Sequence, residues 1–127
     1  MTGNDWMELT VLERRKYNYL VEVMDVSRQL GEALDRNDQV SVKLLVAMRQ
    51  EPILHLKELQ TIIADRRSKI EDDSRLQALL DGAPPQIREE AAYIDQVGIA
   101  RRLLEQILVL DRRLNTRLAG KDSYYNR

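Results

Sequence analysis

The sequence contains no cysteine, and this absence excludes both disulfide bonds and thiolate chemistry. A chain that does without disulfides is typical of a reducing compartment, so we expect a cytoplasmic protein. The first residues, MTGNDWMELT, have no basic region followed by an apolar run. That is not the pattern of a secretory signal, and we expect none here.

Glycine, proline and aromatic residues are also scarce. Among 127 residues there are five glycines, three prolines, one tryptophan and no phenylalanine. The core must therefore be built from aliphatic side chains. Hydrophobic residues make up 43% of the chain and charged residues 32%, a balance that favours long helices. The length fits one domain, and no apolar run approaches the roughly 20 residues that a membrane-spanning helix needs, so we expect no membrane insertion.

An excess of one charge is missing as well, because 20 basic residues stand against 21 acidic ones. Arginines recur in pairs, but each pair has an acidic residue close by, which is typical of a solvated helix face. The pairs are Arg14–Arg15, Arg66–Arg67, Arg101–Arg102 and Arg112–Arg113. We expect no nucleic-acid binding, and a role of the arginine pairs in binding DNA or RNA is a minor alternative.

Apolar residues recur at helical spacing over three long segments. The first predicted helix spans about 5–35, with Asn4 or Asp5 as its N-cap. The second starts with Asp38 as its N-cap and continues through Pro52, where we expect a kink rather than an end because the apolar stripe keeps its phase. A connection of so few residues makes the first two helices antiparallel. The stripe of the first helix is interrupted by Lys16, Ser27 and Gly31.

A break separates the second long helix from the third. The stripe loses its phase at EDDSRLQALL, where Asp73 or Ser74 can cap a short helix, and DGAPP then ends helical structure. The third long helix is predicted to start after Pro85 and to run to about Ala119, with Gly120 as its stop.

These segments predict an all-α fold, an elongated antiparallel three-helix bundle or coiled coil with a kinked second helix. Residues 1–119 are expected to form a single helical-bundle domain, and residues 120–127 a mobile C-terminal tail.

Patterns that would indicate catalysis or metal binding are weak. His55 is the only histidine, and with Glu51 and Glu58 it forms E-x-x-x-H-x-x-E, which lacks the second histidine of the helical zinc motif. No glycine-rich phosphate loop and no nucleophile elbow is present. We therefore expect no catalytic residue, metal or cofactor, and a protein that is not an enzyme. An enzyme or metal site around His55 is the minor alternative.

The segment ARRLLEQILVLDRRL, residues 100–114, has more apolar residues than one helix seam uses. Its seam, at the 4, 3, 4 spacing of a coiled coil, consists of Leu103, Ile107, Leu110 and Leu114. A second apolar row, Leu104 and Leu108, lies roughly 100–140° round the helix and is continued by the polar Asp111 and Asn115. A half-apolar helix end can bind a partner's amphipathic helix, and packing inside the bundle is the alternative.

The stretch ALDRNDQVSVKLLVAMRQEPILHLKELQTIIADRRSKI resembles the helical hairpin of flagellar type III export chaperones of the FlgN and FliT kind. Before it, YNYLVEVMDVSRQLGEAL has the content of their long first helix, and Asp38 stands at the turn. The second helix ends in arginines, here Arg66 and Arg67, and LLEQILVLDRRLNTRLAG is similar to their closing helix. Pro52 and the pronounced break at DGAPPQ depart from the family's pattern.

The resemblance implies a small cytoplasmic chaperone, not an enzyme. Such a chaperone binds an amphipathic terminal helix of an unassembled hook-filament junction or filament-cap protein and keeps it export-competent. Because the C-terminal third usually contributes to substrate binding, the implied partner-binding residues are Leu104, Leu108, Leu110, Asp111, Leu114, Asn115 and Leu118. The alternative is a structural coiled-coil protein that self-associates, for example as a homodimer, and has no client.

Overall fold

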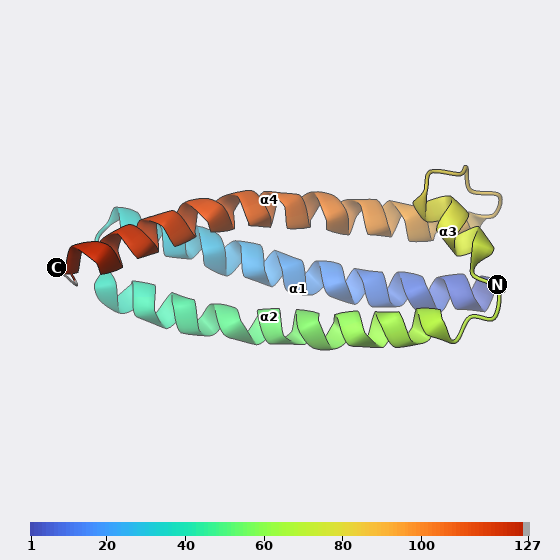
Figure 1. The fold of residues 1–127 in the computed structure, drawn as a ribbon, viewed down its shortest axis with the longest axis horizontal. Helices are drawn as coiled ribbons and strands as arrows, with labels where there is room; N and C mark the ends of the chain where they lie inside the picture. Colours follow the sequence, from blue (N-terminus) through green and yellow to red (C-terminus); the bar gives the residue numbers. More distant parts are fainter. Residues whose placement is uncertain (126–127) are drawn as a thin grey trace.

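The structure, a computed structural model, describes the backbone of residues 1–125 and the side chains of residues 1–120. That part of the chain is all-helical and has no strand, which confirms the predicted class. Three long helices lie alongside one another with alternating direction along the chain, and a short one lies at the end where the chain begins (Figure 1). The helices are α1 (Gly3–Asp35), α2 (Gln39–Ser68), α3 (Ser74–Leu80) and α4 (Arg88–Tyr125).

α1 begins earlier than predicted, because Thr2 is its N-cap in place of Asn4 or Asp5. The Thr2 hydroxyl accepts a hydrogen bond from the Asp5 backbone N–H at 3.2 Å, and the Asp5 carboxylate accepts one from the Thr2 N–H at 2.8 Å. This reciprocal capping box gives partners to two N–H groups that the helix start leaves unpaired. The prediction of Asn4 or Asp5 as the N-cap was wrong because it overlooked a threonine three residues before an acid.

The turn between α1 and α2 depends on two neighbouring polar residues. Asn37 adopts a φ of 55°, a left-handed conformation that asparagine tolerates better than most residues. Asp38 then caps α2, as predicted, and its carboxylate accepts hydrogen bonds from the Ser41 N–H at 3.1 Å and the Ser41 hydroxyl at 2.6 Å. α2 continues from there through Pro52, which is buried inside the helix, so the predicted continuity of the second helix is confirmed.

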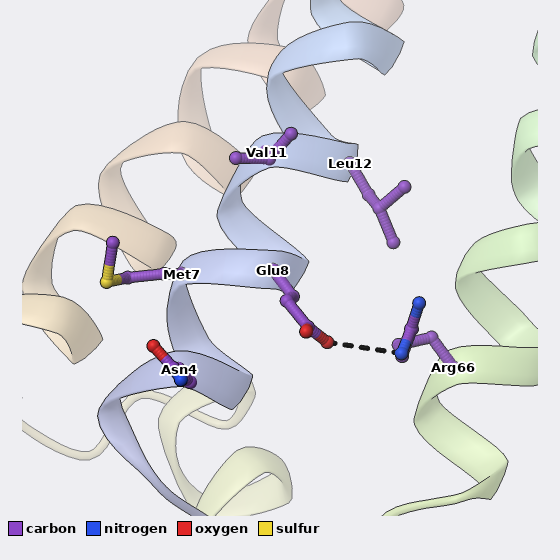
Figure 2. Close-up of a pocket in the computed structure, with 6 residues that line it drawn as sticks. All are labelled: Asn4, Met7, Glu8, Val11, Leu12 and Arg66. Atoms are coloured by element: carbon purple, nitrogen blue, oxygen red, sulfur yellow. Dashed lines mark ion pairs between the residues drawn. The ribbon is translucent and has the colours of Figure 1, made fainter.

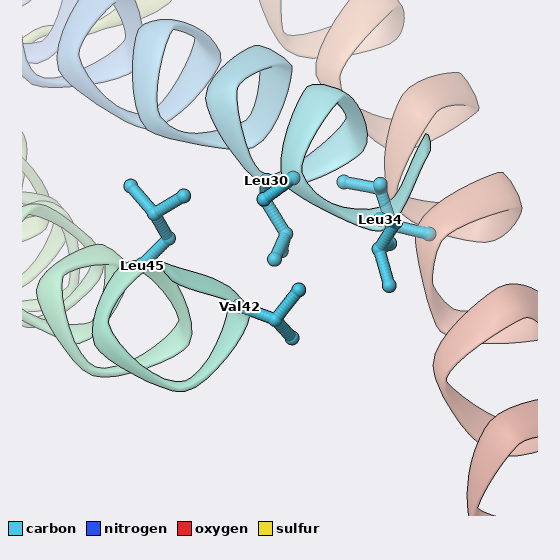
Figure 3. Packing of buried hydrophobic residues seen from close by; sticks show 6 residues of the cluster. Leu30, Leu34, Val42 and Leu45 are labelled. Atoms are coloured by element: carbon cyan, nitrogen blue, oxygen red, sulfur yellow. The ribbon is translucent and has the colours of Figure 1, made fainter. Parts of the chain in front are cut away.

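α1 lies between the other two long helices and contacts both of them (Figure 1). Among the described residues, no Cα atom of α2 comes within 8 Å of one in α4. The core follows α1 from end to end. Near its start, the rings of Trp6 and Tyr93 lie 5.4 Å apart in a tilted arrangement. Near its end, Leu30 and Leu34 face Val42 of α2 (Figure 3).

α4 is longer than predicted. It passes through Gly120 and runs to Tyr125, so the helix end predicted at about Ala119 was wrong. A glycine costs a helix interior about 1 kcal/mol relative to alanine but does not end it unless the chain turns there. The predicted mobile tail therefore overlaps a helix over 120–125, and its last residues, 126–127, lie outside the described part of the chain.

The predicted break between the second and third long helices is present, and hydrogen bonds to the Glu90 carboxylate stabilise the segment that forms it. Arg75 of α3 donates hydrogen bonds to both oxygens of the Glu90 carboxylate, Nε at 2.9 Å and Nη2 at 2.8 Å. The same Nη2 donates to the Pro84 carbonyl at 2.8 Å, and the Gln86 N–H donates to Glu90 at 2.8 Å. The hydrogen bonds that Glu90 accepts, of which those from Arg75 have the largest effect, lower the pKa of Glu90 to about 2.

We expect the stability that Glu90 provides to disappear in acid. Its folded pKa of about 2 lies below its ordinary 4.5, so the contribution is complete above about pH 4.5 and is lost as the pH falls toward 2. Urea unfolding of the wild type and Glu90→Gln at several pH values should show a difference in unfolding free energy that shrinks from neutral pH to pH 3. The neighbouring Glu89, which makes no ion pair among the described residues, provides the control Glu89→Gln. A difference between wild type and Glu90→Gln that stays constant with pH would contradict the interpretation.

Candidate functional site

The seven predicted partner-binding residues of α4 fall into two groups, three that pack against the core and four that lie on the side of α4 facing α2. Leu114 is 2% exposed and packs in the core at the turn between α1 and α2. Leu110 and Leu118 are partly buried against the same cluster. The other buried members of that cluster come from α1 and α2 (Figure 3), namely Leu30, Ala33, Leu34, Val42 and Leu45. Leu114, predicted as part of a partner surface, therefore lies in the core of the described chain, because all three long helices direct apolar side chains to this point.

The remaining four residues share the side of α4 that faces α2. Asp111 forms an ion pair with Arg49 of α2, which fixes the direction of that side. Leu104 and Leu108 precede Asp111 by two turns and one turn of helix, and Asn115 follows it by one turn, so all four lie on one side. Leu104 is half-buried, Leu108 is 47% exposed and Asn115 is exposed. We call these four residues the α2-side edge of α4.

Arg49 joins all three long helices at this edge. Its Nε donates a hydrogen bond to the hydroxyl of Ser27 in α1 at 2.9 Å, and its Nη2 donates to the Asp111 carboxylate of α4. Ser27 is fully buried, so its hydroxyl needs this partner. Burial lowers the pKa of the Arg49 guanidinium. The bridge fixes the position of α2 against both neighbours at one point along the rod.

A second arginine of α2 makes the same kind of bridge further along. Arg67 Nη2 donates a hydrogen bond to the Tyr93 hydroxyl of α4 at 2.7 Å and lies 3.5 Å from the buried Glu13 carboxylate of α1. Burial raises the pKa of Tyr93, and the charge of Arg67 opposes that rise. Arg49 and Arg67 are 18 residues apart, about five helical turns, so both project from the same face of α2.

Sequence reasoning missed both bridges. It treated the Arg66–Arg67 pair as surface residues, whereas only Arg66 is exposed, paired with Glu8 at 3.2 Å. The available signal was Ser27, a small polar residue that interrupts the apolar stripe of the first helix. Such a residue requires a hydrogen-bond partner once it is buried. No local sequence pattern indicated that the partner would be Arg49.

Two hollows flank an exposed ridge near the start of α1. Met7 and Val11 form the ridge. The hollow on the α2 side, about 480 Å³, contains the Glu8–Arg66 ion pair (Figure 2). It is lined by Asn4, Met7, Glu8, Val11, Leu12 and Arg66. The hollow on the α4 side, about 330 Å³, is lined by Met7, Thr10, Val11, Arg14, Arg88, Glu89 and Ala92. Glu8 in the first hollow pairs with Arg66, and the Thr10 hydroxyl at the second donates a hydrogen bond to the Trp6 carbonyl at 2.7 Å.

α2 has an apolar side that faces away from the bundle. Five large apolar side chains on this side are 44% to 81% exposed and lie within about 120° of the helix circumference. They are Val40, Leu44, Met48, Leu54 and Ile62. Single exposed leucines or valines are ordinary on protein surfaces, but a row along one helix is typical of an interaction surface.

His55 and its two glutamates lie on the same exterior of α2. His55 Nε2 is 3.8 Å from Glu51 and Nδ1 is 3.6 Å from Glu58, and the imidazole stacks on Tyr19 with ring centroids 5.0 Å apart. Among the described residues, no group of three or more histidines, cysteines or carboxylates is arranged to hold a metal ion. In the same part of the chain, no helix is long and apolar enough to cross a membrane.

Comparison of the chain with protein-family models, with curated proteins and with solved structures found no match. The family resemblance of the sequence therefore stays a prediction, and any function has to be argued from the surfaces described above.

Proposed function

We propose that this protein is a cytoplasmic export chaperone, without enzymatic activity, that binds an amphipathic terminal helix of an unassembled flagellar protein. The client would be a hook-filament junction or filament-cap protein, as in the export chaperones that the sequence resembles. The proposed fold is an elongated antiparallel three-helix bundle whose α2 bends at Pro52. A rigid rod with apolar rows on its exterior suits this task, because it can bind a helix without refolding.

The observation that carries the proposal is the exposure of Leu108 on the α2-side edge of α4. Leu108 is 47% exposed and stands one turn from the half-buried Leu104. The Arg49–Asp111 ion pair and Asn115 provide polar groups beside these two leucines. An apolar centre with a polar margin is the usual composition of a site that binds a helix. Burial of one leucine under a client helix contributes about 1.5–3 kcal/mol.

We expect Leu108→Asp to weaken client binding by about 10-fold to 100-fold, the equivalent of losing one buried leucine. The measurement is fluorescence anisotropy with labelled terminal-helix peptides of hook-filament junction and filament-cap proteins. Val109→Asp is the matched control, because Val109 is 46% exposed but lies about 100° round the helix from Leu108. Equal loss in both variants, or no binding by the wild type, would contradict the proposal.

The second candidate is a structural protein that self-associates and has no client. It is favoured by the same exposed Leu108, because a homodimer could bury Leu104 and Leu108 of both copies. Sedimentation equilibrium separates the two. A wild-type dimer that Leu108→Asp converts to monomer, together with no peptide binding, supports self-association. A monomer that binds the peptides supports the chaperone.

A further inference from the structure

The outer side of α2 has the spacing of a second coiled-coil seam. Starting at Val40, side chains recur at intervals of 4, 3, 4, 3 and 4 residues along its outward face, the repeat by which one helix packs on another. The positions are Val40, Leu44, Ala47, Glu51, Leu54 and Glu58, and all six side chains are exposed. We call them the α2 outer seam. Met48 and Ile62, also exposed and apolar, flank it.

This seam is separate from the face of α2 that forms the core. The core face includes Leu45, Leu59 and Ile63, all of them buried. It lies about 120° round the helix from the outer seam. A helix that only closes a bundle needs one apolar face, and α2 has two. The bundle accounts for the first and leaves the second without a partner among the described residues.

The charges of the outer seam determine what can cover it. Glu51 and Glu58 are one heptad apart within the apolar seam. Each lies near the His55 imidazole, Glu51 at 3.8 Å and Glu58 at 3.6 Å, which is beyond hydrogen-bond distance. Within the described chain neither carboxylate pairs with a lysine or an arginine. Both carboxylates are therefore free to accept hydrogen bonds from a partner.

A second copy of α2 is a poor partner for this seam. In a parallel pair, Glu51 would face Glu51 and Glu58 would face Glu58. In an antiparallel pair centred on the seam, Glu51 would lie opposite Ala47 and Glu58 opposite Val40, so neither carboxylate would meet a basic side chain. Like charges opposite each other act against the parallel pair, and carboxylates covered by apolar side chains without a basic partner act against the antiparallel one. The complementary partner is a helix with its own apolar seam and a lysine or arginine at two positions one heptad apart.

We infer that the α2 outer seam binds a basic amphipathic helix of a partner protein. Leu44 and Leu54 contact the apolar residues of that helix, and Glu51 and Glu58 form ion pairs with its two basic residues. The surface lies on a different helix from the α2-side edge of α4. The inference goes beyond the proposed function and does not depend on it.

Two synthetic helical peptides of about three heptads test the inference. They share one leucine seam and differ only at two seam positions a heptad apart, which are lysine in one peptide and glutamate in the other. We expect the wild type to bind the lysine peptide at least 10-fold more tightly than the glutamate peptide. Glu51→Lys with Glu58→Lys should reverse that preference. Glu22→Lys with Glu105→Lys, at exposed positions of α1 and α4, makes the same change in net charge and should leave the preference unchanged.

The apolar part of the seam is tested with uncharged substitutions. Leu44→Ser with Leu54→Ser should weaken binding of the lysine peptide at least 10-fold, whereas Met7→Ser with Val109→Ser, at exposed positions on other helices, should not. Unchanged circular dichroism spectra and melting temperatures show that each variant remains folded.

A lysine peptide that binds equally to the wild type and to the Glu51→Lys, Glu58→Lys variant overturns the inference. The inference is also overturned if the wild type is a dimer in sedimentation and the Leu44→Ser, Leu54→Ser variant is a monomer, because a second copy of the chain then covers the α2 outer seam. If Leu108→Asp had no effect on client binding, the proposed function would fail, but the peptide result at the α2 outer seam would not change.

Discussion

Leu114→Ala should lower the free energy of unfolding by about 2–5 kcal/mol, whereas Leu108→Ala should change it by no more than about 0.5 kcal/mol. Both are leucines of α4, but Leu114 is 2% exposed and Leu108 is 47% exposed. A Cβ added at Gly31 would lie 3.7 Å from Leu114 Cδ2, so Leu114 packs against α1 where α1 has no side chain. Truncation to alanine leaves a cavity there that helix backbones cannot easily close. Urea denaturation followed by circular dichroism measures both values.

The same pair of variants tests the division of α4 into core and surface. If Leu114→Ala were as stable as Leu108→Ala, Leu114 would not be a core residue, and its predicted role in partner binding would return. If Leu108→Ala were strongly destabilising, the α2-side edge of α4 would belong to the core. The proposed client surface would then lose its apolar centre.

Breaking the Arg49–Asp111 pair from one side should cost more than replacing both residues. Arg49→Met leaves the Asp111 carboxylate and the buried Ser27 hydroxyl without their partner, and Asp111→Leu leaves Arg49 without a counter-charge. We expect each single change to lower the unfolding free energy by about 2–3 kcal/mol. That is somewhat less than the loss for a fully buried pair, because the Asp111 side chain is 26% exposed. The double variant should lie within about 1 kcal/mol of the wild type, since two apolar side chains can replace a buried ion pair.

A double-mutant cycle in urea measures this coupling. The Arg117–Asp35 pair, 2.8 Å apart with side chains 41% and 71% exposed, supplies a control cycle. Its coupling should stay below about 1 kcal/mol, as is usual for exposed pairs. If the effects of Arg49→Met and Asp111→Leu were simply additive, the bridge would not stabilise the packing of α2 on α4.

Local sequence patterns were sufficient to predict the helices of this chain. Asp38 was recognisable as an N-cap because the cap depends on residues within one turn of it. The apolar stripe kept its phase across Pro52, and this indicated continuity despite the proline. The two errors, at the start of α1 and at the end of α4, also concern local structure. Several polar residues near Thr2 can cap a helix, and the reciprocal bond with Asp5 selects Thr2. Glycine can either end a helix or continue it, and at Gly120 the helix continues.

The candidate site was harder to predict because it depends on which helices meet. Leu108 and Leu114 look alike in the sequence. Leu114 is a core residue only because residues of α1 and α2 pack against it, whereas Leu108 stays exposed. The bridge of Ser27, Arg49 and Asp111 joins three segments far apart in the chain, and no spacing rule links them. A bundle's helical periodicity shows that a residue faces inward, but not which neighbour it meets there.

The central position of α1 has a mechanical consequence. α2 and α4 each pack on α1, and in the described chain no Cα atom of α2 comes within 8 Å of one in α4. Any displacement of α2 relative to α4 therefore breaks contacts with α1 as well as the hydrogen bonds of Arg49 and Arg67, which join α2 to α4 at two points. The two arginines thus set the position of the outer helices relative to each other directly, whereas contact with α1 sets it only through a third helix.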